Sequence, residues 1–173
     1  MQSVLIYGAG GGTGTFAIQI ARALGAQVTA VTRTEKLDIL RSIGADHVID
    51  HTREDFTRRG ERYDVLFDIG ANRSSADLER VLVPNGKLVL AGAPKRLGAL
   101  MVRLPETLVL RRTRRRLVSA RVSQADLIAL TELVEDGKLS PVIDRAYPLS
   151  DVPEAFRYFE SGQVRGKVVI SVP

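Results

Sequence analysis

A glycine-rich loop separates a predicted strand from a predicted helix near the start of the chain. Residues 8–14 read GAGGGTG and follow the apolar run Ser3 to Tyr7, which predicts a buried strand. Apolar residues from Phe16 to Leu24 then recur at helical spacing, and Gly25 stands where a helix end favours positive φ. The chain therefore passes from a strand through a sharp turn into a helix, which is typical of α/β folds.

The same alternation continues along most of the chain. Further strands are predicted at residues 27–32, 47–49, 64–69, 87–91 and 117–121. These runs are mostly apolar rather than alternating, as in a parallel sheet that helices cover on both faces. Because crossovers between parallel strands are right-handed, we expect a doubly wound six-stranded parallel sheet.

Capping signals mark several of the connecting helices. Thr32 and Glu35 have capping-box spacing before a helix that ends at Gly44, and Ser123 and Asp126 have it before a helix at 124–136. Other helices are predicted after Thr52, at 75–82 and at 105–112. Residues 141–173 instead predict a strand, a helix and a strand. We expect a main domain at residues 1–140 and a C-terminal strand-helix-strand appendage at residues 141–173.

The glycine loop has the composition of a pyrophosphate site. A strand, a glycine turn and a helix N-terminus present free backbone N–H groups and a positive dipole end. The best register is Ala9-x-Gly11-x-x-Gly14, with alanine in place of the first glycine. The loop therefore favours a dinucleotide, although a glycine turn that only lets the helix pack on the sheet remains the alternative.

The end of the second strand indicates which dinucleotide would bind. No carboxylate is present there to accept from the ribose hydroxyls, whereas Thr32, Arg33 and Lys36 could meet a 2′-phosphate. We therefore expect NADP(H) rather than NAD(H). In the alternative, Arg33 and Lys36 are solvated residues at the start of a helix.

Composition and motifs exclude several other classes. The chain has no cysteine, and His47 and His51 lack a carboxylate partner for a metal site, so no metal is expected. None of the four tyrosines has a lysine four residues later, which argues against a short-chain dehydrogenase. The missing acid after the second strand also disfavours a methyltransferase. No apolar run could span a bilayer and no leader precedes the first strand, so we expect a soluble cytoplasmic protein.

A basic cluster at Arg111 to Arg116 suggests a second function. Five of its six residues are arginines in a chain with 25 Lys and Arg against 20 Asp and Glu. Such runs attract phosphate backbones, so the alternative is a module that binds nucleic acid or an acidic partner. No aromatic residue interrupts the cluster to stack on bases, and a solvated linker is the preferred interpretation.

Several longer stretches resemble one known family. They are VLIYGAGGGTGTFAIQIARALGAQVTAV, LRSIGADHVIDHTREDF, YDVLFDIGAN, VLVPNGKLVLAGAP and PVIDRAYPLSDVPEAFRYFESGQVRGKVVISV. The chain resembles the medium-chain dehydrogenase/reductases, and within them the zinc-independent quinone oxidoreductase branch. This resemblance implies a Rossmann fold of strand order 3-2-1-4-5-6. It also implies NADPH-dependent hydride transfer to a quinone or an activated alkene or ketone as the small-molecule substrate.

The resemblance also implies a set of cofactor-binding residues. The glycine loop would hold the pyrophosphate, the end of the second strand and His51 the 2′-phosphate, and the loops after the fourth and fifth strands the nicotinamide half. The positions are Ala9, Gly10, Gly11, Gly12, Thr13, Gly14, Thr32, Arg33, Lys36, His51, Gly70, Ala71, Gly92 and Ala93. The family offers no general acid or nucleophile at these positions, so no catalytic residue is assigned.

The resemblance carries two expectations about assembly. In the family a GroES-like domain precedes this region and supplies most of the substrate pocket, so we expect an excised or truncated domain that is inactive alone. The edge strand at 117–121 would pair with its copy in a homodimer.

Overall fold

The computed structural model describes residues 1–70, 72–91, 115–117 and 123–172. Its main sheet has six parallel strands in the order β3-β2-β1-β4-β5-β6. The strands are β1 (Ser3–Tyr7), β2 (Gln27–Thr32), β3 (His47–Asp50), β4 (Tyr63–Asp68), β5 (Leu82–Leu90) and β6 (Arg115–Leu117). The predicted parallel sheet and its strand order are confirmed.

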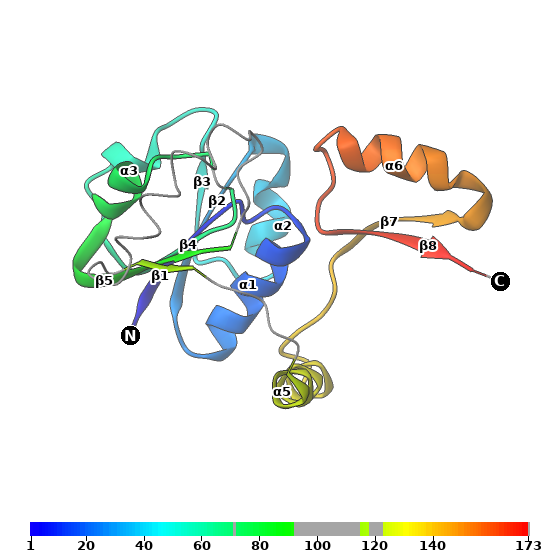
Figure 1. Ribbon diagram of the computed structural model, residues 1–173, viewed down its shortest axis with the longest axis horizontal. Coiled ribbons are helices and arrows are strands. Elements are labelled where there is room, and N and C mark those ends of the chain that lie inside the picture. The colour runs from blue at the N-terminus through cyan, green and yellow to red at the C-terminus, as the bar shows by residue number, and fades with distance from the viewer. Residues whose placement is uncertain (71, 92–114, 118–122, 173) are drawn as a thin grey trace.

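Helices cover both faces of this sheet (Figure 1). One face carries α1 (Gly12–Ala23) and α2 (Leu37–Ser42), and the other carries α3 (Ser75–Glu79). Two core clusters correspond to the two faces. Adjacent residues of β1 point to opposite faces of the sheet and so belong to different clusters. Leu5 packs with Leu66 on one face, and Ile6 packs with Ile18 on the other. All four side chains are fully buried, which explains the continuous apolar strand pattern.

The C-terminal part forms a second, smaller unit (Figure 1). Parallel strands β7 (Ile143–Pro148) and β8 (Lys167–Ser171) pair with each other, and α6 (Val152–Glu160) connects them. The predicted strand-helix-strand pattern is confirmed. In the sequence, α5 (Gln124–Glu135) precedes this unit, and Ser123 accepts a hydrogen bond from the Asp126 N–H as its capping spacing predicts.

Two of the predicted helix starts are wrong. Thr32 does not cap the next helix, because it is the last residue of β2 and its carbonyl accepts from the His51 N–H at 3.0 Å. That helix begins as a 3-10 turn at Thr34–Lys36 with Arg33 at its N-cap. Thr52 does not open a helix either, and the short 3-10 helix Phe56–Arg58 is capped by Asp55 instead.

The last two strands of the main sheet differ from the predicted ranges. Strand β5 begins at Leu82, before the predicted start at residue 87, and passes through Asn85, which has a φ of 71° and marks an irregularity within the strand. Strand β6 covers Arg115–Leu117, and residues 118–121 of the predicted edge strand lie outside the described residues. The helix predicted at 105–112 also lies outside them. Among the described helices, none is long and apolar enough to cross a membrane.

Candidate cofactor site

The glycine loop leads from β1 into α1 at the carboxyl end of the sheet. Gly8 has a φ of 87°, and the N–H groups of Gly8 and Ala9 both donate to the Val31 carbonyl at 3.2 Å. The N-cap of α1 is Gly11, which has no side chain to satisfy the first N–H groups of the helix. No side-chain cap therefore occupies this helix end, and the helix dipole favours an anion there.

Two glycines of the loop have different structural reasons to be glycine. A Cβ on Gly14 would lie 2.5 Å from Cα of Ala9, so this glycine allows α1 to pack against the loop. A Cβ on Gly11 would have its nearest neighbour 4.0 Å away, at the Gly8 carbonyl oxygen, and Gly11 has an ordinary φ of −98°. Gly11 therefore leaves open space beside the helix N-terminus. This cradle fits the close approach of a pyrophosphate to the backbone.

The residues predicted to bind the 2′-phosphate lie close together but differ in burial and in hydrogen bonding. Thr32 is buried and Arg33 is exposed at the end of β2. Lys36 is buried, and its amine donates to the carbonyls of Gly162 at 2.9 Å and Val164 at 2.6 Å. Burial lowers the pKa of the Lys36 amine. Arg33 is thus the exposed cation of this group, while Lys36 attaches the C-terminal unit to the loop region.

His51 follows β3 and contacts the aromatic side chain at the end of β1. The rings of His51 and Tyr7 meet edge to face with centroids 6.1 Å apart. Next to His51, the Asp50 carboxylate accepts hydrogen bonds from the hydroxyls of Thr34 and Thr52 and from the Thr52 N–H. These bonds, that of Thr34 first, lower the pKa of Asp50 to about 2.

The hydrogen bonds to Asp50 predict that part of the free energy of unfolding is lost at acidic pH. Because its pKa in the folded protein lies below the unfolded value near ~4, the ionised carboxylate stabilises the fold above that pH. This contribution is lost as the pH falls from about 4 to about 2. In urea unfolding between those pH values, Asp50→Asn should lose less stability than the wild type, and a parallel decline of the two proteins would contradict the assignment.

The nicotinamide side of the predicted site is described only in part. Gly70 follows β4, and its N–H donates to the Tyr7 carbonyl at 3.1 Å. A Cβ on Gly8 would lie 2.8 Å from the Gly70 nitrogen, so the loops after β1 and β4 touch where the strand order reverses. Such a switch point is where α/β sheets bind ligands. The predicted residues Ala71, Gly92 and Ala93 lie outside the described residues.

A side chain that the sequence analysis missed reaches the loop from the C-terminal unit. Gly11 forms a parallel bridge with Gly166, and the next residue, Lys167, places its amine 5.7 Å from the centroid of the Phe16 ring. A Cβ on Gly12 would lie 2.8 Å from that amine. No spacing rule connects residues more than 150 positions apart, so only the tertiary structure reveals this neighbour.

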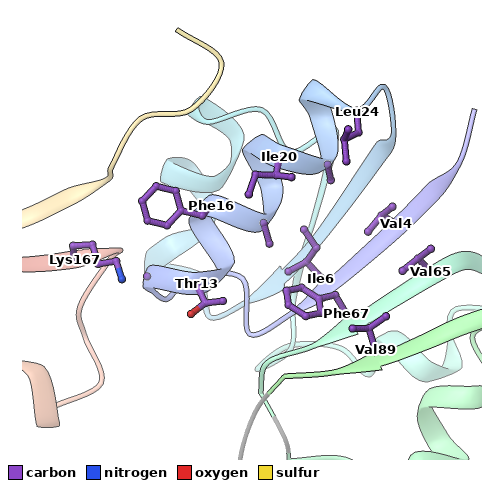
Figure 2. A pocket seen from close by; sticks show the side chains of 13 residues that line it. Val4, Ile6, Thr13, Phe16, Ile20, Leu24, Val65, Phe67, Val89 and Lys167 are labelled. Carbon is purple, nitrogen blue, oxygen red and sulfur yellow. The ribbon is translucent and has the colours of Figure 1, made fainter. Parts of the chain in front are cut away.

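A separate apolar pocket of about 470 Å³ lies between α1 and the sheet. It is lined by Phe16 and Ile20 of α1, by Leu24 at the C-cap of this helix, and by the strand residues Val4 and Phe67, while Thr13 and Lys167 lie at its glycine-loop end (Figure 2). The pocket runs beside the helix rather than in front of its N-terminus. Within the described part of the chain, no group of three His, Cys, Asp or Glu side chains could hold a metal ion.

Comparison with known proteins identifies relatives along nearly the whole chain. The zinc-binding dehydrogenase family matches residues 43–170. The mitochondrial NAD(P)H oxidoreductase RTN4IP1 of Mus musculus is 34% identical over 97% of this chain and 47% of its own length. The chloroplastic NADPH-dependent alkenal/one oxidoreductase of Arabidopsis thaliana is 34% identical over 98% of this chain and 40% of its own.

Solved structures show the same similarity. The quinone oxidoreductase from Coxiella burnetii superposes with a TM-score of 0.83 at 28% identity, and the match covers 99% of this chain and 53% of that one. The chain thus spans about half the length of the relatives that it matches.

Proposed function

Since the chain belongs to the zinc-binding dehydrogenase family, in the quinone oxidoreductase-like branch of the medium-chain dehydrogenase/reductases, we propose that it binds NADP(H) through the glycine loop and Arg33. The proposed reaction is hydride transfer to a quinone or to an activated alkene or ketone. A relative named an alkenal/one oxidoreductase supports this substrate class. The observation that carries the cofactor choice is the exposed Arg33 beside Thr32, where β2 ends without a carboxylate.

The described residues would bind and orient the cofactor. The α1 N-terminus would hold the pyrophosphate with backbone N–H groups, and Gly11 would let it approach. Arg33 would pair with the 2′-phosphate, and His51 lies one residue past β3 on the same edge of the sheet. The bound nicotinamide would supply the hydride. The chain's own contribution is to fix the donor in position, so that transfer depends on geometry.

The remaining predictions about organisation stay proposals. We propose a cofactor-binding domain at residues 1–140, an appendage at 141–173 and no turnover without a substrate-binding domain of the kind the family carries. A location in the cytoplasm and a homodimer through the strand at 117–121 also stay predictions. No finding favours the nucleic-acid alternative, and only Arg115 and Arg116 of its basic cluster lie within the described residues.

Charge reversal at Arg33 tests the cofactor choice. Calorimetric titration of the wild type should show NADPH binding at least about tenfold tighter than NADH, a difference of ~1.4 kcal/mol. Arg33→Glu should weaken NADPH binding about tenfold or more, because a carboxylate would then face the 2′-phosphate, and should leave NADH affinity nearly unchanged.

The matched control is Arg41→Glu, the same charge change at a partly exposed arginine of α2 that pairs with Asp38. It should leave both affinities unchanged. Equal losses for the two nucleotides in Arg33→Glu, or tighter NADH binding by the wild type, would contradict the NADP(H) assignment.

A further inference from the structure

The segment from Gly162 to Lys167 holds the C-terminal unit against the glycine loop at two points. On one side, the Lys36 amine donates to the carbonyls of Gly162 and Val164. On the other side, Gly166 bridges Gly11, the N-cap of α1. The backbone before β8 is therefore anchored on both sides of the loop, and this anchoring fixes where the Lys167 side chain begins.

The Lys167 side chain lies along the first turn of α1 (Figure 2). Its Cε, Cδ and Nζ would all lie within 2.8 Å of a Cβ on Gly12, the first residue of that helix. The amine also lies 5.7 Å from the Phe16 ring centroid, one turn further along the same helix face. Lys167 thus places a positive charge at the helix end that the dipole already makes attractive to anions.

The two lysines near the loop differ in what their amines contact. The Lys36 amine is buried and occupied by two carbonyl oxygens. Lys167 is exposed, and within the described ranges no carboxylate pairs with its amine. A flexible lysine stem with three donors can follow a phosphate without a fixed fork geometry. Lys167 is therefore the lysine that is available to a ligand at the loop.

We propose that Lys167 is a cofactor-binding residue that donates to the pyrophosphate of the dinucleotide from the C-terminal unit. This inference rests on the proposed function and extends it, because it makes residues 162–167 part of the cofactor site. The pyrophosphate is the group expected at the first turn of α1. The 2′-phosphate is expected beside Arg33, at the end of β2, so Lys167 should act on NADPH and NADH alike.

The test compares nucleotide affinities of the full chain and its variants by calorimetry. Lys167→Met keeps the apolar stem and removes the charge, and it should weaken NADPH and NADH by the same factor of about ten. Lys167→Arg should restore most of the affinity. The control Lys138→Met removes the charge of another exposed lysine, which pairs with Asp136, and should change neither affinity.

Thermal unfolding separates ligand binding from a structural role. The proposal expects the melting temperature without nucleotide to stay at the wild-type value in Lys167→Met, while the increase on adding NADPH becomes smaller. A lower melting temperature without nucleotide together with unchanged affinity would overturn the proposal. So would a loss confined to NADPH, which would place Lys167 at the 2′-phosphate. Failure of the wild type to bind either nucleotide would instead overturn the proposed function, and this inference with it.

Discussion

Replacing Gly14 by alanine should destabilise the fold and impair cofactor binding together. The added methyl group would lie 2.5 Å from Cα and carbonyl carbon of Ala9, and these are backbone atoms that cannot rotate away. The first turn of α1 would have to move off the loop. Overpacking of this kind costs about 1–3 kcal/mol or more, and alanine's helix preference over glycine offsets ~1 kcal/mol at most. We expect a net loss of about 1–2 kcal/mol in urea unfolding.

Gly11→Ala is the matched control, because it adds the same methyl group to the same loop in open space. Its φ of −98° suits any residue, so its stability should stay within ~0.5 kcal/mol of the wild type. Its NADPH affinity should nevertheless fall, since the methyl group would face the approaching pyrophosphate. Equal stability losses in the two variants would show that neither glycine has the specific role assigned to it.

The parts of the fold that follow local rules were predictable from the sequence. Strands β1 and β2 have the predicted bounds because mostly apolar runs next to predicted helices identify buried parallel strands. Ser123 caps α5 as predicted, because a serine side chain at an N-cap accepts a hydrogen bond from a backbone N–H of the first helical turn. Thr32 has the same spacing to an acidic residue, but it does not cap a helix. It ends β2, and its carbonyl accepts a hydrogen bond from the N–H of the residue after β3. The hydrogen bonds of the sheet therefore decide the conformation of Thr32 over its local preference to cap a helix.

The candidate site could be predicted only where its residues are close in sequence, and its role in cofactor binding stays a proposal. The glycine loop and Arg33 could be assigned because a strand, a turn and the next strand end form one continuous unit. The burial and hydrogen bonds of the Lys36 amine could not be predicted. Its partners are backbone carbonyls more than 120 residues away, and every residue has a carbonyl, so the sequence does not mark them. The position of Lys167 beside the glycine loop could not be predicted for the same reason, because its neighbours are distant in the sequence. Both depend on how the C-terminal unit docks, which tertiary packing decides.

Truncation of Phe56 should destabilise the fold strongly. Its side chain is 1% exposed in the turn after β3, and its ring lies 5.1 Å from that of Tyr7, the last residue of β1. Phe56→Ala would leave a cavity beneath the carboxyl edge of the sheet, where relaxation is limited because Tyr7 belongs to a central strand. Truncations of this kind cost about 3–5 kcal/mol.

The control for Phe56 is the same substitution on the C-terminal unit. Phe156 of α6 is 63% exposed, so Phe156→Ala should change the free energy of unfolding by less than ~0.5 kcal/mol. Urea unfolding of both variants measures the difference. Since Tyr7 also contacts His51, the cavity should loosen the sheet edge that is proposed to bind the cofactor, and NADPH affinity should fall in Phe56→Ala alone. Similar midpoints for the two variants would show that the turn after β3 is not part of the cooperative core.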